Sequence, residues 1–117
     1  MSQKIKIKSK KELKLSEGWE KFERYCKIHN LAEDTIDFYK LGYKYLEDFL
    51  GKKYMLQKIN EEVIEKFIEF LINTEMKNTS INSRLRAVRR YIYYYIEKGY
   101  IKKFKISLLK VQKKKDR

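Results

Sequence analysis

The sequence of 117 residues has no proline, four glycines, one cysteine and one histidine. Because proline and glycine are the strongest helix breakers, long helical segments meet few interruptions here. One cysteine excludes an internal disulfide and a cysteine-based zinc cluster, and Cys26 follows Trp19 by two helical turns, which predicts a buried side chain. His29 has no second ligand at metal-binding spacing, so it is interpreted as a residue at a helix end. We expect neither a metal nor a cofactor.

Long hydrophobic runs are also missing. The apolar runs are a few residues long, far below the roughly 20 that cross a bilayer, and the first residues lack the apolar core of a signal peptide. These absences predict a soluble, cytoplasmic protein with no membrane partner. The length suits one domain, and a hydrophobic content of 43% with ten tyrosines, six phenylalanines and one tryptophan is enough for its core.

Positive charge is abundant and unevenly distributed, with a net value of +13. Residues 16–76 carry nine basic and thirteen acidic side chains, as an ordinary helical body would. Residues 1–15 carry six basic and one acidic, residues 77–97 five and one, and residues 98–117 nine and one. A chain that is basic at both ends and along its last helix predicts a polyanionic partner.

Apolar residues repeat with helical spacing in four segments, which predicts an all-α protein. The first runs over residues 17–28 with Ser16 as N-cap, and the second over residues 33–50, ended by Gly51. The third follows the N-cap Asn60, and the fourth begins with Asn78 or Thr79 as cap and ends at Gly99. Residues 1–15 and 102–117 stay open between a short strand, a linker and a mobile basic arm, and we expect mobile arms when no nucleic acid is bound.

The fourth helix has two chemically different faces. Its apolar stripe and its polar side each contain residues at helical spacing. The stripe consists of Ile81, Leu85, Val88, Ile92, Tyr95 and Ile96, and the polar side of Asn82, Arg86, Arg90 and Tyr93. Arginine suits phosphate because its planar guanidinium donates two parallel hydrogen bonds and stays charged. A solvated surface helix is the simpler alternative.

Four patterns along these helices occur together in one known family. The second helix has Thr-Ile-x-x-Tyr and then Leu-x-x-Phe-Leu, the third opens with Ile-Asn-x-x-x-Ile, and the fourth has Ser-Ile-x-x-x-Leu-x-Ala-Val-Arg before Gly-Tyr-Ile. The matching residues are Thr35, Ile36, Tyr39, Leu46, Phe49, Leu50, Ile59, Asn60, Ile64, Ser80, Ile81, Leu85, Ala87, Val88, Arg89, Gly99, Tyr100 and Ile101. The sequence resembles the amino-terminal core-binding, or SAM-like, domain of phage integrases and other tyrosine recombinases.

The resemblance implies a small orthogonal four-helix bundle with basic tails, in a bacterial or phage-encoded protein. It implies a basic arm over residues 1–15, a core-binding domain over residues 16–101, and a linker over residues 102–117 toward a catalytic domain. In the intact recombinase, duplex DNA is clamped between the two domains, and further protomers assemble on it. His29 is followed by Asn30, Leu31 and Ala32, so the catalytic His-x-x-Arg element is missing and this chain is expected to be non-catalytic.

The resemblance also implies that the second and fourth helices face the duplex. Arg86 and Arg90 are the first candidates for DNA contacts. The residues expected around them are Lys40, Lys44, Thr35, Asn82 and Ser83. Arg84 and Arg89 are further candidates, although their place beside the apolar stripe also allows packing against it or pairing with Glu65 or Glu69.

Two other functions remain open. The first is a helical protein-interaction or self-association module whose basic tails keep it soluble or bind acidic proteins. The second is binding of RNA or single-stranded DNA, because aromatic side chains stack on bases. Tyr91 and Tyr95 are expected in the core, which leaves Tyr93 and Tyr94 as a thin stacking surface.

Overall fold

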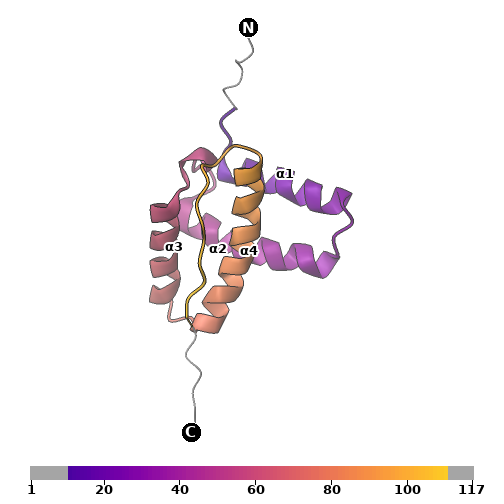
Figure 1. The fold of residues 1–117 in the computed structure, drawn as a ribbon. Helices are drawn as coiled ribbons and strands as arrows, with labels where there is room; N and C mark the ends of the chain where they lie inside the picture. The colour runs from indigo at the N-terminus through magenta and orange to yellow at the C-terminus, as the bar shows by residue number, and fades with distance from the viewer. Residues whose placement is uncertain (1–10, 111–117) are drawn as a thin grey trace.

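A computed structural model describes residues 11–110 of the chain. The four helices are α1 (Leu15–Ile28), α2 (Glu33–Leu50), α3 (Glu61–Asn73) and α4 (Asn78–Glu97), with a short 3-10 helix, η2 (Leu56–Lys58), before α3. Within the described range no strand forms, and the predicted all-α class is confirmed (Figure 1).

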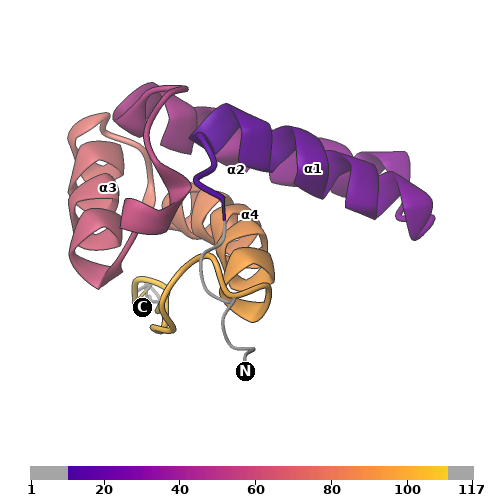
Figure 2. The ribbon, with the colours of Figure 1, turned by 90° about the horizontal axis from the view of Figure 1, so that it is seen from above.

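The helices form two pairs that cross. α1 and α2 lie side by side as a hairpin, and α3 and α4 lie alongside each other across it (Figures 1 and 2). α2 and α4 make the largest contact between helices. The predicted orthogonal arrangement is therefore correct, and α2 and α4 each touch all of the other helices.

Local signals fix most of the helix ends. The Asn60 side chain accepts the Val63 N–H at 2.9 Å, as expected of an N-cap. Gly51 and Gly99 follow α2 and α4 at φ 94° and 86°, values that favour glycine. Two predicted starts are wrong: α1 begins at Leu15 after Lys14, and α4 begins after Lys77. In α1 the reason is Glu17, whose carboxylate accepts the Lys14 N–H at 2.9 Å and caps the helix two residues before Ser16 could.

The core is rich in aromatic rings. Trp19 of α1 stacks on Tyr43 of α2 with ring centroids 5.0 Å apart. Tyr91 and Tyr95 of α4 are buried, as predicted, and donate hydrogen bonds to the carbonyls of Leu15 at 3.0 Å and Gly18 at 2.7 Å. Cys26 is buried, also as predicted, and burial raises the pKa of its thiol. These hydrogen bonds attach α1 to α4 from inside the core.

α2 and α4 approach most closely at Gly42. A Cβ atom there would come to 2.4 Å from the Ala87 Cβ and 3.0 Å from the Arg84 carbonyl oxygen. Neither atom is the end of a flexible side chain, so a larger residue must push the two helices apart. The absence of a side chain at Gly42 thus sets the spacing that orients α4.

We predict that Gly42→Ala lowers the free energy of unfolding by about 2 kcal/mol. Overpacking of this kind costs up to about 3 kcal/mol, and the better helix propensity of alanine returns about 1 kcal/mol. Chemical denaturation measures the difference. Lys40→Ala, on the exposed face of the same helix, is the control and should change stability by less than about 0.5 kcal/mol. Equal stability of the two variants would show that α2 and α4 tolerate a wider spacing.

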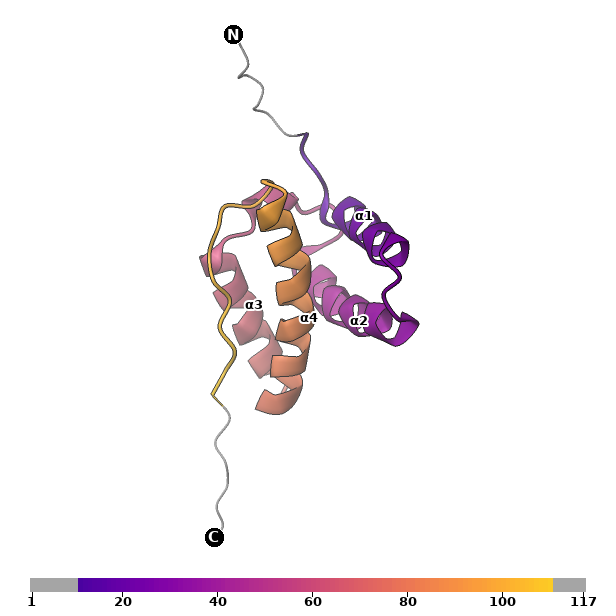
Figure 3. The ribbon, with the colours of Figure 1, turned by 45° about the vertical axis from the view of Figure 1, so that its right-hand side comes forward.

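The segments flanking the helices are packed where the structure describes them. Leu13 is buried, its carbonyl accepts the Leu56 N–H at 2.8 Å, and Lys14 forms an isolated antiparallel bridge with Met55. Residues 101–110 run as an extended segment beside α3 and α4, with Ile101 and Ile106 buried (Figure 3). The expected mobility of the arms is therefore wrong for these stretches, because their apolar residues have sites in the core. Residues 1–10 and 111–117 lie outside the described part of the chain.

Candidate nucleic-acid interface

The solvent face of α4 consists of Ser83, Arg86 and Arg90. Arg86 is exposed, and the other two are half-buried. On a helical wheel Arg86 points away from the contact of Ala87 with Gly42, whereas Ser83 and Arg90 lie one turn before and after Ala87 and flank that contact. The predicted polar side of the helix is thus partly open to solvent and carries two guanidinium groups one turn apart.

The arginines of α4 are not neutralised by neighbours. Within residues 11–110 the ion pairs are Lys27–Glu23, Lys44–Glu47 and Lys66–Glu62. No pair with Glu65 or Glu69 forms in this range. Arg84 instead lies over the Tyr45 ring, with its guanidinium carbon 5.1 Å from the centroid, while Arg89 is half-buried. Packing against neighbours is therefore the observed arrangement for Arg84, and the charge of all four arginines remains uncompensated by these carboxylates.

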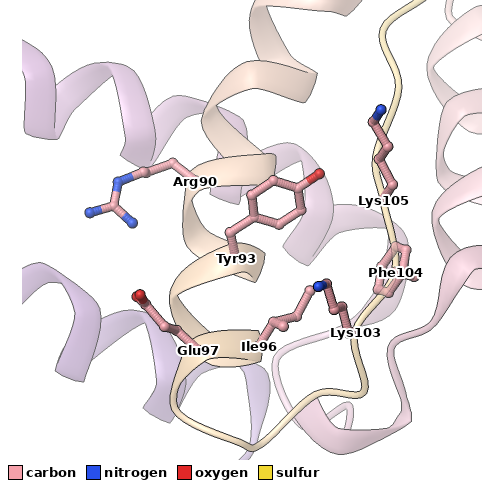
Figure 4. Close-up of a pocket in the computed structure, with 7 residues that line it drawn as sticks. All are labelled: Arg90, Tyr93, Ile96, Glu97, Lys103, Phe104 and Lys105. Carbon is pink, nitrogen blue, oxygen red and sulfur yellow. The ribbon is translucent and has the colours of Figure 1, made fainter.

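Arg90 lies at the junction of α4 with α1. Its guanidinium carbon is 5.9 Å from the Phe22 ring centroid. Burial raises the pKa of the Cys26 thiol, and the positive charge of Arg90 partly offsets that rise. In Figure 4, Arg90 and Glu97 project on one side of α4, whereas Tyr93 and Ile96 turn toward the extended segment. The charged group of Arg90 therefore lies over the Phe22 ring, and the residue is half-buried.

The predicted residues on α2 divide between two faces. Thr35 precedes Gly42 by two turns, so it lies on the face that meets α4. Lys40 and Lys44 are each two residues from Gly42 and point the opposite way, where they line a groove with residues of α1. Lys44 also pairs with Glu47 at 3.5 Å. The fold does not bring these two lysines beside the arginines of α4.

Asn82 is not available to a ligand in this structure. Its side chain is 5% exposed, its Nδ2 donates to the Leu109 carbonyl at 2.9 Å, and its Oδ1 accepts the Leu109 N–H at 2.8 Å. Asn82 lies off the apolar stripe of α4, but it is buried, so its predicted exposure is wrong. Sequence reasoning missed that a packed segment, 101–110, covers this position.

The stacking surface expected for single strands is also reduced. Tyr94 is only 9% exposed and packs 4.7 Å from the Tyr25 ring, measured between centroids, so its predicted exposure is wrong. Tyr93 is half-buried, and its hydroxyl accepts the Ile106 N–H at 3.0 Å. One partly covered tyrosine remains where two exposed ones were expected.

Two further basic residues lie near this surface, both in a stretch that the sequence analysis expected to be a mobile arm. Lys103 and Lys105 border an open groove of about 630 Å³ together with Arg90. Among residues 11–110, Glu97 is the acidic residue on its border. The signal in the sequence was the alternation of lysine with Phe104 and Ile106, which is the pattern of an extended segment with one side buried.

Other kinds of site find no support among residues 11–110. His29 is the C-cap of α1 and packs on Tyr25, with ring centroids 4.2 Å apart. No cluster of three potential metal ligands occurs in this range. None of the helices described has the length and apolar character of a membrane span.

Comparison with known families agrees with this geometry. The phage integrase SAM-like domain matches residues 19–114, which include most of α1, the other three helices and the extended segment. The chain belongs to the phage integrase SAM-like domain family. Membership links it to DNA integration and recombination. No curated protein matches the chain.

A solved structure shares the fold of this SAM-like domain. It is the N-terminal domain of a phage integrase/site-specific recombinase from Haloarcula marismortui, with a TM-score of 0.72 and 8% sequence identity. The match covers 80% of this chain and 90% of that domain. At this low identity the similarity shows the arrangement of helices and carries no residue roles.

Proposed function

We propose that this SAM-like domain binds duplex DNA through the solvent face of α4, with Arg86 and Arg90 on phosphates, Ser83 beside them and Thr35 contributing from α2. The observation that carries the proposal is the pair of arginines, one exposed and one half-buried, that form no ion pair within residues 11–110 of an integrase-family domain. Lys40 and Lys44 point to another face and Asn82 is buried, so the proposed surface omits them.

The contacts proposed here would position the domain on DNA more than read its sequence. Arginine and hydroxyl groups on phosphate oxygens carry no base identity. Each neutralised phosphate releases counterions and contributes about −0.9 to the slope of log K against log salt. Weak, strongly salt-dependent binding is therefore the expected behaviour of the domain by itself.

In the intact protein we propose that this non-catalytic domain forms one side of a clamp, opposite a catalytic domain of the same protein. Other recombinase protomers on the same DNA would be its further partners. The chemistry of breaking and rejoining strands would belong to that second domain. Membership in the integrase family supports this division of work.

A competition between polyanions tests the proposal against a protein-interaction module. The chain is titrated with a short duplex and with an acidic polypeptide of matched charge density, at several salt concentrations. We expect clear preference for the duplex, because it presents phosphates at fixed spacing to arginines on a rigid helix, whereas a flexible acidic chain loses conformational entropy when it binds. Equal affinity for the two polyanions would contradict DNA binding and favour the interaction module.

A further inference from the structure

The extended segment of residues 101–110, called the docked segment below, lies along α3 and α4 (Figures 1 and 3). Ile101 and Ile106 are its buried anchors, at 3% and 2% exposure. Phe104, Leu108 and Leu109 are half-buried against the core. Because these apolar side chains are buried or half-buried, the segment is held on the bundle and is not a free basic tail.

Three side chains of α4 hydrogen-bond to the backbone of the docked segment. One is Asn78, whose Nδ2 donates to the Lys110 carbonyl at 3.5 Å. Asn82 exchanges two hydrogen bonds with Leu109, at 2.9 and 2.8 Å, in the manner of a neighbouring strand. The Tyr93 hydroxyl accepts the Ile106 N–H at 3.0 Å. Together these bonds fix the segment near its middle and near its end. Because they engage the backbone, they set its register on α4 and leave the exposed side chains free.

The register determines where the lysines lie. Side chains of an extended chain alternate between two sides, and burial of Phe104 and Ile106 leaves Lys103 and Lys105 exposed. Both lysines border the open groove that also contains Arg90, while Tyr93, Ile96 and Phe104 form its apolar wall (Figure 4). Two lysines of the docked segment and Arg90 of α4 thus border one groove from different sides of α4 (Figure 4), and Glu97 is the acidic residue on that border among residues 11–110.

We propose that the docked segment completes the DNA surface, with Lys103 and Lys105 contacting phosphates beside Arg90, and with Asn82 and Tyr93 as positioning residues that hold them there. This proposal rests on the proposed function of α4. Lysines on a docked segment lose less conformational entropy on binding than lysines on a mobile arm. Docking therefore makes the charges of Lys103 and Lys105 part of a surface with a fixed shape.

The experiment compares three changes in the full chain: Lys103→Ala with Lys105→Ala, Asn82→Ala, and all three substitutions together. Duplex affinity is measured at several salt concentrations, and amide hydrogen exchange at Ile106 and Leu109 reports docking. We expect the lysine pair to lower the salt slope by about 1.8, the value for two phosphates. Asn82→Ala should lower the slope similarly while exposing the Leu109 amide to exchange, and the combined variant should lose little more.

Three further variants serve as controls, for the loss of positive charge, for unfolding of the domain and for the sign of the charge at the groove. Lys40→Ala with Lys44→Ala removes the same charge from the opposite face of α2 and should leave the slope nearly unchanged. Tyr93→Phe removes only the acceptor of the Ile106 N–H and serves if Asn82→Ala unfolds the domain. Glu97→Gln should increase affinity, because the carboxylate borders the same groove.

The possible failures are distinguishable. If the Lys103 and Lys105 variant keeps its slope while an Arg86 and Arg90 variant loses slope, the docked segment is not part of the surface and the proposed function stands. If neither variant changes the slope, both proposals are wrong. If Asn82→Ala and Tyr93→Phe free the amides for exchange and the slope stays intact, the positioning roles are overturned.

Discussion

Replacing Arg86 and Arg90 by alanine together should weaken duplex binding about 100-fold at low salt. Each hydrogen-bonded contact between a guanidinium and a phosphate contributes about 1.5 kcal/mol, and two such contacts correspond to about two decades in affinity. The salt slope should fall by about 1.8, because two phosphates are no longer neutralised. Neither arginine pairs with a carboxylate within residues 11–110, so the loss is not offset by release of an acidic partner.

Titration of labelled duplex at several salt concentrations measures both quantities, and circular dichroism verifies that the helices remain. Lys40→Ala with Lys44→Ala is the matched control, since it removes two charges of the same sign from the other face of α2. A specific surface predicts a large effect for the arginines and a small one for the lysines. Equal effects would mean that net charge alone attracts DNA, and the proposed interface would be wrong.

A rise in pH above about 10 should unfold the domain steeply. Burial raises the pKa of Tyr43, Tyr91 and Tyr95, and nearby groups, among them Glu47 beside Tyr43, add to the shift. In the unfolded chain these phenols ionise near pH 10. Because the folded state keeps protons that the unfolded state releases, stability is complete below about pH 10 and falls as the pH rises further. Each tyrosine contributes about 1.4 kcal/mol per pH unit, about 4 kcal/mol for the three.

A loss of that size is comparable to the whole stability of a small domain, about 5–15 kcal/mol. Denaturation at a series of pH values from about 8 to 11, with tyrosinate absorbance as a second probe, measures it. Tyr91→Phe should cost about 1 kcal/mol at neutral pH, because the Leu15 carbonyl loses its donor. The same variant should reduce the alkaline slope by about one third. Tyrosinate absorbance that rises near pH 10 while the helices remain folded would contradict the prediction.

Much of the fold followed from local patterns in the sequence. Helical periodicity and the signals at Asn60, Gly51 and Gly99 placed four helices with small errors at two starts. The α1 start was missed because the cap comes from Glu17 reaching back to Lys14, a pairing that no single residue type reveals. Burial of Cys26, Tyr91 and other stripe residues was predictable because helix wheels assign them to one side.

The candidate site was only partly predictable. Arg86 and Arg90 were found from their spacing, since that property belongs to one helix. Lys40 and Lys44 were misplaced because their position relative to α4 depends on the close contact at Gly42, which fixes how α2 turns. Asn82 looked like an exposed amide until residues 101–110 were seen to cover it.

The sequence alone determined the helices, their order, the excess of positive charge and the two arginines on one face of α4. These properties depend on neighbours within a few residues or on composition. Only the tertiary structure decided which cations share a surface, because that depends on contacts between distant segments. The Leu109 backbone bonds to Asn82 across 27 positions of sequence, and this contact places Lys103 and Lys105 on a groove that Arg90 also borders.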